Sequence, residues 1–143
     1  QNGDKVGARG LELSVDSQWA NATRLRASLS LQRAAYSGGT ALYNSPRLLA
    51  RANLSAPLPW AGASAGVEWR HDSSRITLDG SALPGVSLVN AHVGFAVAPG
   101  LEVSLGVQNL FGARYAQPGS RNNWQNALEQ DGRSISARLD CRF

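Results

Sequence analysis

The sequence predicts an all-β fold, a transmembrane antiparallel up-and-down β-barrel. Three observations predict it. Apolar and polar residues alternate up to the C-terminal residue. Seven segments of the chain show this alternation, and the connections between them alternate between short and long. Together these are the sequence features of an outer-membrane barrel.

The C-terminal segment gives the clearest of these signals. From Ile135 to Phe143, apolar residues occupy the odd positions and polar residues the even ones. This is the period of a strand with one apolar face. The last residues of a soluble domain usually fray, whereas the closing strand of an outer-membrane barrel ends at an interface lined with aromatic side chains. We therefore expect a barrel strand that ends at Phe143.

The first two expected strands cover residues 6–18 and 23–36. Each alternates. The polar positions are Glu12, Ser14 and Asp16 in the first strand and Arg24, Arg26, Ser28, Ser30 and Gln32 in the second. Such alternation predicts strands with one lipid-facing and one water-facing side. The apolar positions are Leu11, Leu13 and Val15 in the first strand and Leu25, Ala27, Leu29 and Leu31 in the second.

The third and fourth expected strands cover residues 47–56 and 63–71. Their alternation is equally regular, but the apolar residues of the third strand fall on even numbers. A strand can begin on either parity, so only the period of two matters. The apolar positions are Leu48, Ala50, Ala52 and Leu54 in the third strand and Ala65, Val67 and Trp69 in the fourth.

The remaining expected strands cover residues 86–98, 101–111 and 133–143. The first of these lies in an uncharged stretch long enough for a transmembrane helix, but Pro84, Gly94 and Pro99 oppose a helix there. Most of the seven segments reach the ~9–11 residues that a tilted transmembrane strand needs. The apolar positions are Ala91, Val93, Phe95, Val97, Leu101, Val103, Leu105, Val107, Ile135, Ala137, Leu139, Cys141 and Phe143.

The connections between these strands alternate in length. Short ones lie around residues 19–21, 57–62 and 99–100, and long ones cover residues 37–46, 72–85 and 112–132. Barrels of the outer membrane have short periplasmic turns and long extracellular loops. We therefore expect the three long loops outside the cell, and Trp19, Trp60 and Phe143 at the periplasmic interface.

Composition excludes several other classes of protein. Charged residues make up 17% of the chain, below the ~25% usual in soluble domains. The net charge is +4, but the arginines are scattered, whereas a nucleic-acid site needs a basic cluster, so we expect no nucleic-acid partner. The single cysteine, Cys141, excludes an internal disulfide and a cysteine-based metal site.

Seven strands do not complete a barrel. Bacterial single-chain barrels have an even number of strands and at least about eight. The first expected strand also runs downward from an external loop, so a further strand should precede it. We therefore expect residues 1–143 to form one unit, the C-terminal part of a larger barrel domain.

Several short motifs resemble those of TonB-dependent outer-membrane receptors of the siderophore-receptor type. Asn109-Leu110-Phe111 followed by Tyr115 is similar to an element at the top of the penultimate strand in that family. The segment 130–133 before the last strand resembles the start of the family's closing strand, and Arg9-Gly10-Leu11-Glu12 resembles an upstream strand start. Gly112 stands where the family usually has Asp.

The resemblance implies a 22-stranded barrel plugged by an N-terminal globular domain, in the outer membrane of a Gram-negative bacterium. Such receptors take up scarce chelates, most often ferric siderophores and less often cobalamin or haem. The TonB complex supplies energy through the plug. Plug and remaining strands are expected outside these residues, which would form about the last third of the barrel. The resemblance also implies that the barrel-assembly machinery reads Phe143.

Candidate ligand residues are sought in the long loops. Arginine binds carboxylate or catecholate oxygens with a two-pronged fork, and aromatic rings offer area for stacking. An anionic, often aromatic chelate would therefore use side chains of these two kinds. The candidates are Tyr43, Arg75, Arg114, Tyr115, Arg121 and Trp124; ordinary rim positions remain the alternative for each.

The sequence contains no catalytic or metal-binding pattern. No nucleophile elbow is present, and neither His71 nor His92 shares a ligand spacing with an acidic residue. We expect no enzyme activity and no resident cofactor, with His71 at the rim and His92 in the lumen. On the water-facing side we expect two cross-strand charge pairs, Asp16 with Arg24 and Glu102 with Arg142.

Two other classes of protein remain as alternatives. One is a passive porin or another outer-membrane barrel. The other is a soluble lipid-binding barrel, which would turn its Leu, Val and Ile inward and its charged residues out to water. The direction in which the apolar side chains point separates the soluble barrel from the others.

Overall fold

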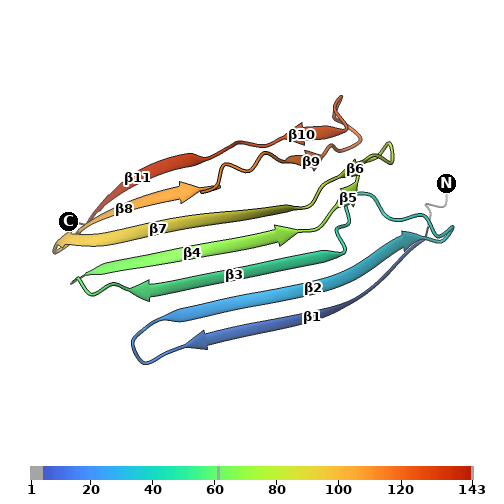
Figure 1. Ribbon diagram of the computed structural model, residues 1–143. Coiled ribbons are helices and arrows are strands. Elements are labelled where there is room, and N and C mark those ends of the chain that lie inside the picture. The colour runs from blue at the N-terminus through green and yellow to red at the C-terminus, as the bar shows by residue number, and fades with distance from the viewer. Residues whose placement is uncertain (1–4, 61, 143) are drawn as a thin grey trace.

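The computed structural model describes residues 5–60 and 62–142, and it shows one seven-stranded antiparallel sheet in the order β1-β2-β3-β4-β7-β8-β11 (Figure 1). Two small two-stranded pieces, β5 with β6 and β9 with β10, lie in the loops. The described residues contain no helix that is long and apolar enough to cross a membrane. The sheet strands are β1 (Val6–Gln18), β2 (Arg24–Tyr36), β3 (Leu48–Pro57), β4 (Ala63–Asp72), β7 (Val86–Ala98), β8 (Leu101–Gln108) and β11 (Ser134–Cys141).

The register places the predicted apolar positions of the seven strands on one face. Leu25 lies opposite Leu54, and the row continues across every later strand of the sheet. Because side chains alternate between faces, one matched row fixes the face of the other residues, up to the register shift between Ala96 and Ala98 on β7. The predicted alternation is therefore confirmed. The row is Leu25, Leu54, Val67, Ala91, Val107 and Ile135.

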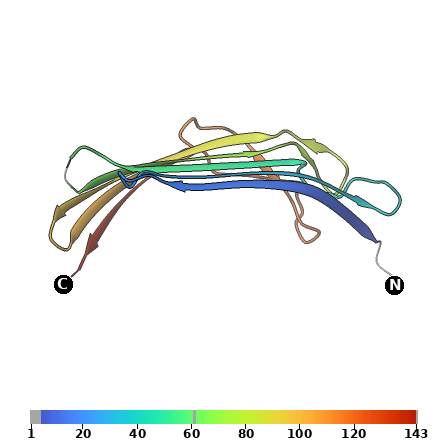
Figure 2. The same cartoon turned by 90° about the horizontal axis from the view of Figure 1, so that it is seen from below.

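No second layer of the described chain covers this apolar face. Figure 2 shows the sheet as a single curved layer. Leu13 is 59% exposed and Ile135 76%, while the buried apolar residues among those described are few: Ala50, Ala63, Val86 and Leu88. An apolar face of this extent needs a non-aqueous neighbour.

The connections have the expected lengths, with tight turns at one end of the sheet and long loops at the other (Figure 1). One turn requires a glycine. Gly100 has a φ of 76°, and a Cβ there would stand 2.6 Å from the carbonyl oxygen of Arg142. The backbone of Arg142 therefore packs closely against the turn that joins β7 to β8.

Strand β8 ends earlier than predicted. It stops at Gln108 and not at Phe111, because Asn109 adopts a left-handed conformation with a φ of 50°. The loop pieces β5 (Arg75–Ile76), β6 (Ala82–Leu83), β9 (Ala116–Pro118) and β10 (Ala127–Glu129) were not predicted. They are too short to show a period of two. Phe143 lies outside the described residues.

The two predicted charge pairs fare differently. Asp16 lies opposite Arg26 and not opposite Arg24, yet it binds both, at 2.8 Å from Arg24 and 3.3 Å from Arg26. The pairing of Glu102 with Arg142 is wrong, since Glu102 lies opposite Asp140. The predicted partner of Glu102 was therefore displaced by two residues along the last strand, from Asp140 to Arg142. Such a step keeps every side chain on its face, so alternation alone cannot detect it.

Candidate functional site

The three long loops meet at one end of the sheet. They cover residues 37–47, 73–85 and 109–133, and β6 of the second loop contacts β9 of the third. Figure 1 shows β5, β6, β9 and β10 grouped at this end. The candidate residues for ligand binding belong to these loops or to the strand ends beneath them.

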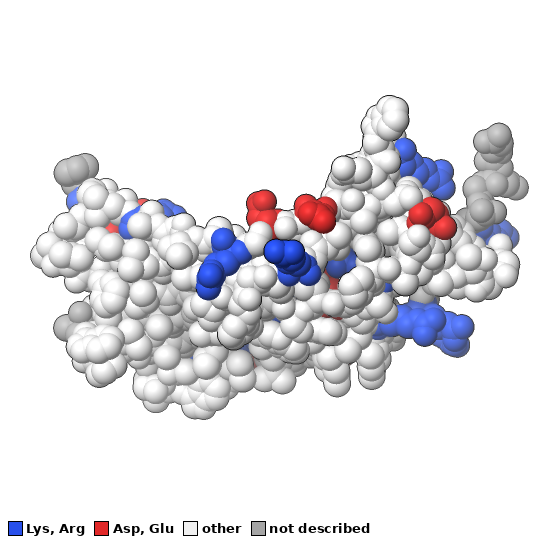
Figure 3. All heavy atoms as spheres, turned by 45° about the horizontal axis from the view of Figure 1, so that its top comes forward, with Lys and Arg blue, Asp and Glu red and all other residues white. Residues whose placement is uncertain are grey.

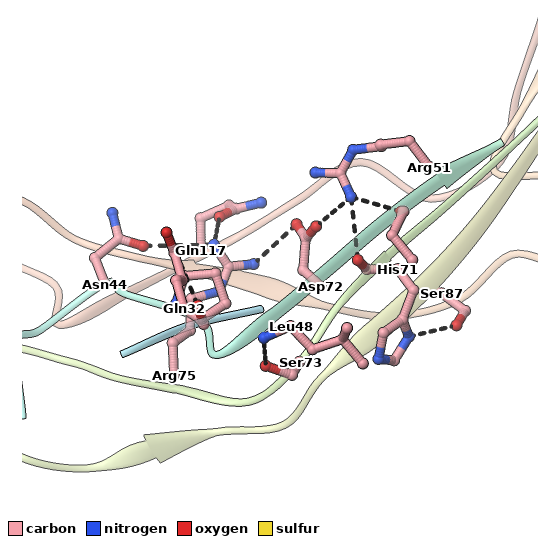
Figure 4. Close-up of polar contacts among 12 residues, drawn as sticks. Gln32, Asn44, Leu48, Arg51, His71, Asp72, Ser73, Arg75, Ser87 and Gln117 are labelled. Carbon is pink, nitrogen blue, oxygen red and sulfur yellow. Dashed lines mark hydrogen bonds and ion pairs between the residues drawn. The ribbon is translucent and has the colours of Figure 1, made fainter. Parts of the chain in front are cut away.

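Arg75 joins the three loops. Its Nη1 donates to Oε1 of Gln117 at 2.8 Å and to Oδ1 of Asn44 at 3.4 Å, and its side chain is only 8% exposed (Figure 4). Asn44 lies in the first long loop and Gln117 in the third. A buried guanidinium with several acceptors fixes its partners in place. Arg75 therefore holds the loops together.

Asp72, the last residue of β4, supports this arrangement from below. Its carboxylate lies 2.7 Å from Nη1 of Arg51 and 3.5 Å from Nη2 of Arg75. Arg51 also donates to the backbone carbonyl of His71 at 3.1 Å. The buried carboxylate is thus compensated by two cations, as a charge in a low-dielectric site requires.

A second contact between loops is made by Asp79. Its carboxylate accepts hydrogen bonds from the Thr77 hydroxyl and from the Ser81 amide, and Asn126 of the third loop donates to it at 2.6 Å. The Thr77 hydroxyl, followed by the Ser81 amide, holds the pKa of Asp79 below its ordinary value. The charged form therefore stabilises this turn.

The chain enters the third loop through a turn made by Asn109. Its side chain accepts from the amide of Ala113 and donates to the carbonyl of the same residue, both at 2.9 Å. Its own amide donates to Oδ1 of Asn90 at 2.9 Å. A left-handed Asn with local side-chain bonds is a common way to build a tight turn. This turn sets the direction of Arg114 and Tyr115.

Two pockets lie beside this turn, and Tyr115 lines both. The larger, of about 470 Å³, lies between the β6 end and the third loop. The smaller, of about 210 Å³, lies over the polar face of the sheet next to Arg70 and Asn90. The larger pocket is lined by Leu83, Pro84, Arg114, Tyr115, Ala116, Glu129, Gln130 and Gly132.

The structure brings together only two of the six predicted loop residues. Arg114 and Tyr115 line the larger pocket. Arg121 and Trp124 lie on the exposed segment between β9 and β10, where Trp124 is fully exposed. Tyr43 is half-buried in the first long loop. Arg75 is engaged by Asp72, Asn44 and Gln117 and does not line this pocket, and its role as a ligand contact stays a prediction.

Two polar residues that line the larger pocket were not among the predicted candidates. Glu129 and Gln130 reach the larger pocket because β10 pairs with β9, which places Glu129 opposite Ala116. The amide of Gln130 also donates to the carbonyl of Tyr115 at 3.0 Å. No local signal marks these residues, since the three-residue strands are too short to be read from sequence.

The polar face of the sheet is hollowed and carries charges of both signs. A depression of about 490 Å³ lies over β1 to β4 and includes Asp16, Arg26, Arg51 and Glu68. In Figure 3, basic and acidic side chains lie close together along the upper edge of the molecule, and the broad surface below them is mostly uncharged. A hollow lined by charges of both signs suits water or a polar domain but not lipid.

The two histidines lie at separate places. His71 packs beside Trp69, with ring centroids 6.3 Å apart, and bonds the Ser87 hydroxyl at 2.8 Å. His92 covers Gly66, where a Cβ would stand 2.2 Å from the imidazole ring. Within residues 5–60 and 62–142, no group of three His, Cys, Asp or Glu side chains lies close enough to hold a metal ion.

Comparison with known families and structures gives a consistent result. The family model described as "TonB dependent receptor-like, beta-barrel" matches residues 1–110. No curated protein matches the sequence. Three solved structures have a similar fold. They are the ferric yersiniabactin uptake receptor FyuA from Yersinia pestis (TM-score 0.89, 18% identity), the ferric-catecholate import receptor Fiu from Escherichia coli K12 in its closed form (TM-score 0.84, 19% identity) and the copper transporter OprC (TM-score 0.77, 22% identity).

The similarity covers nearly all of this chain but a small part of those proteins. The alignment covers 99% of this chain and 24% of FyuA, 98% and 21% for Fiu, and 98% and 24% for OprC. The seven-stranded sheet therefore has the fold of one part of a larger barrel.

Proposed function

The chain belongs to the family of TonB-dependent receptor β-barrels, and from this we propose that the whole protein takes up a ferric siderophore across the outer membrane of a Gram-negative bacterium. In this proposal the chain supplies barrel wall and three extracellular loops. A plug domain and further strands complete the receptor, and the TonB complex acts through the plug.

The two faces of the sheet support a membrane setting. The apolar face is continuous across seven strands and largely exposed, as a wall in contact with lipid requires. The opposite face carries ion pairs such as Asp16 with Arg26 in a hollow. A soluble barrel would place these faces the other way round. Outer-membrane lipid and a polar lumen are the proposed neighbours.

The proposal for the ligand rests on the pocket beside Arg114 and Tyr115. The guanidinium of Arg114 and the phenol of Tyr115 line one cavity of about 470 Å³ at the long-loop end of the sheet. A guanidinium binds anionic oxygens with its two-pronged fork, and a phenol ring offers stacking area. These groups suit an anionic chelate with aromatic rings. Tyr43, Arg121 and Trp124, which do not line this pocket, are proposed as outer contacts made before the ligand reaches it.

The test uses the full-length receptor in a strain that lacks its other siderophore receptors. Uptake of radiolabelled iron is measured with ferric catecholate and ferric hydroxamate complexes as probes. Replacing Arg114 with Gln should lower catecholate uptake about tenfold or more, because one charged hydrogen bond is lost. Arg47→Gln is the matched control, since Arg47 is an exposed loop arginine that does not line the pocket.

Two results would count against the proposal. Equal uptake by the Arg114→Gln and Arg47→Gln variants would show that Arg114 and its pocket do not bind the ligand. Uptake that continues at the same rate in a strain without TonB would favour a passive porin. The amount of folded receptor in the membrane is measured for each variant, so that a loss of assembly is not read as a loss of binding.

A further inference from the structure

The apolar face of the sheet contains an isolated pair of arginines. Within the described residues of the seven strands, this face carries no Asp, Glu or Lys and only two Arg, Arg9 on β1 and Arg33 on β2. Both are exposed. The five ion pairs formed among the described residues involve neither of them. Two cations that have no acidic partner among the described residues need an explanation on a lipid-facing surface.

The two arginines are direct neighbours. Arg9 lies opposite Arg33 in the antiparallel register, so their Cβ atoms are about 4.5–5.5 Å apart. Like charges in this arrangement repel and weaken strand pairing. An anion placed between the two guanidinium groups would reverse the sign of this interaction.

The height of the pair places it at a membrane interface. Arg9 lies ten residues before Trp19, which is about 33 Å along a strand at roughly 3.3 Å per residue. With a strand tilt of about 40° this is about 25 Å across the membrane, the height of the apolar band of such a barrel. Trp19 marks the short-turn interface, so the arginines lie at the interface on the long-loop side.

The surface around the pair is consistent with this position. Towards the short turns, the next outward residues are Leu11 and Leu31, which are 58% and 46% exposed. Towards the long loops, the next outward residues are Gly7 and Ala35, and a Cβ at Gly7 would have no atom within 4 Å. The pair therefore lies at the border between an apolar band and an open space.

From this placement we infer that Arg9 and Arg33 together bind a phosphate group of the glycolipid in the outer leaflet, the bisphosphorylated lipid A of lipopolysaccharide. Arginine pairs with phosphate through parallel N–H···O bonds, and two opposed guanidinium groups can hold one phosphate from both sides. The acyl chains would then lie against Leu11 and Leu31. The inference rests on the proposed orientation, with the long loops outside the cell.

The test measures lipid binding to the purified full-length receptor in detergent by native mass spectrometry. The probes are bisphosphorylated lipid A, the same lipid A after phosphatase treatment, and phosphatidylglycerol. The variants are Arg9→Gln, Arg33→Gln, the double variant and Arg9→Lys, with Arg47→Gln as control. Arg47 precedes β3 beside Gln32, which belongs to the polar face.

The double variant should bind bisphosphorylated lipid A about ten- to a hundredfold more weakly, while the Arg47→Gln control stays within about twofold. Arg9→Lys should show a smaller loss, since it keeps the charge but not the fork. Dephosphorylated lipid A should bind weakly to every form of the receptor.

Three results would overturn the inference. The first is unchanged binding by the double variant. The second is equal binding of phosphatidylglycerol, which would make the pair a general anion site. The third is a loss of barrel heat stability with unchanged lipid binding, which would show that the pair acts in barrel stability and not in lipid binding. Siderophore uptake is measured in parallel, so a failure of the proposed transport function is recognised separately.

Discussion

Arg75 donates a 2.8 Å hydrogen bond to Gln117, a residue 42 positions further along the chain. This contact joins the second and third long loops, and the same guanidinium reaches Asn44 of the first. The candidate ligand pocket is lined by segments of the second and third loops. Its shape therefore depends on a contact that lies outside the pocket itself.

Breaking this contact should loosen the third loop. Replacing Gln117 with Ala removes a partly buried hydrogen bond to a charged group, which costs about 1.5–3 kcal/mol. Hydrogen exchange at residues 113–119 should become faster, with little change in the strands. Gln125→Ala, in the exposed segment of the same loop, is the control, and equal exchange in both variants would contradict the role given to Arg75.

The lipid-facing side should tolerate charge poorly. Leu105 lies opposite Val93 on the apolar face, so Leu105→Arg should lower the free energy of unfolding by about 2–4 kcal/mol if it lies near the midplane. Ser104→Arg, one residue away on the polar face, should cost much less because its charge stays hydrated. Denaturant titration of the full-length barrel in lipid measures both. Equal costs would indicate a sheet buried on both sides.

The contact between Asp79 and its neighbours should depend on pH. Its pKa in the folded state is lowered, first by the Thr77 hydroxyl and then by the Ser81 amide. The stabilisation is therefore present above the unfolded value of 3.8 and lost as the pH falls through the lower folded value. Loop mobility measured by spin labels should stay constant from pH 7 to about pH 5 and rise in more acidic solution. Asp79→Asn should remove this dependence.

Surface labelling should reveal the orientation of the sheet. In the full-length protein with Cys141 replaced by Ala, a cysteine at Gly38 or Ser120 should react with an impermeant reagent on intact cells, and one at Ala20 should not. Ala20 serves better than Gly100, where any side chain would meet the Arg142 carbonyl oxygen. The opposite labelling pattern would show that the sheet has the reverse orientation in the membrane. The long loops would then face the periplasm and could not bind an external ligand.

Deletion of Phe143 should affect assembly and not ligand affinity. From its place in the alternating sequence 135–143 and the family resemblance, we propose that the barrel-assembly machinery recognises it. The amount of heat-modifiable barrel in the outer membrane should fall, while siderophore affinity per folded molecule stays the same. Deleting residues 114–126 should do the reverse. Normal assembly without Phe143 would contradict this role.

The alternation of the seven strands was sufficient to predict the sheet, its two faces and the order of short and long connections. The reason is physical, because a period of two along the chain fixes which face of the sheet a side chain occupies. A sheet with Leu and Val on one face and Arg and Ser on the other is stable only where the first face is kept from water and the second meets water. The same pattern could not predict the register. Glu102 lies opposite Asp140 and not Arg142, because a shift by two residues leaves both faces unchanged.

The loops show what only the tertiary structure decided. The sequence identified Arg75 and Arg114 as equivalent loop arginines, yet the fold surrounds Arg75 with Asp72, Asn44 and Gln117 and leaves Arg114 beside a pocket. Hydrogen bonds between residues more than 30 positions apart carry no local signal. The inference about Arg9 and Arg33 needed both the sequence and the structure. The period of two places each arginine on the apolar face, but only the register shows that they are neighbours.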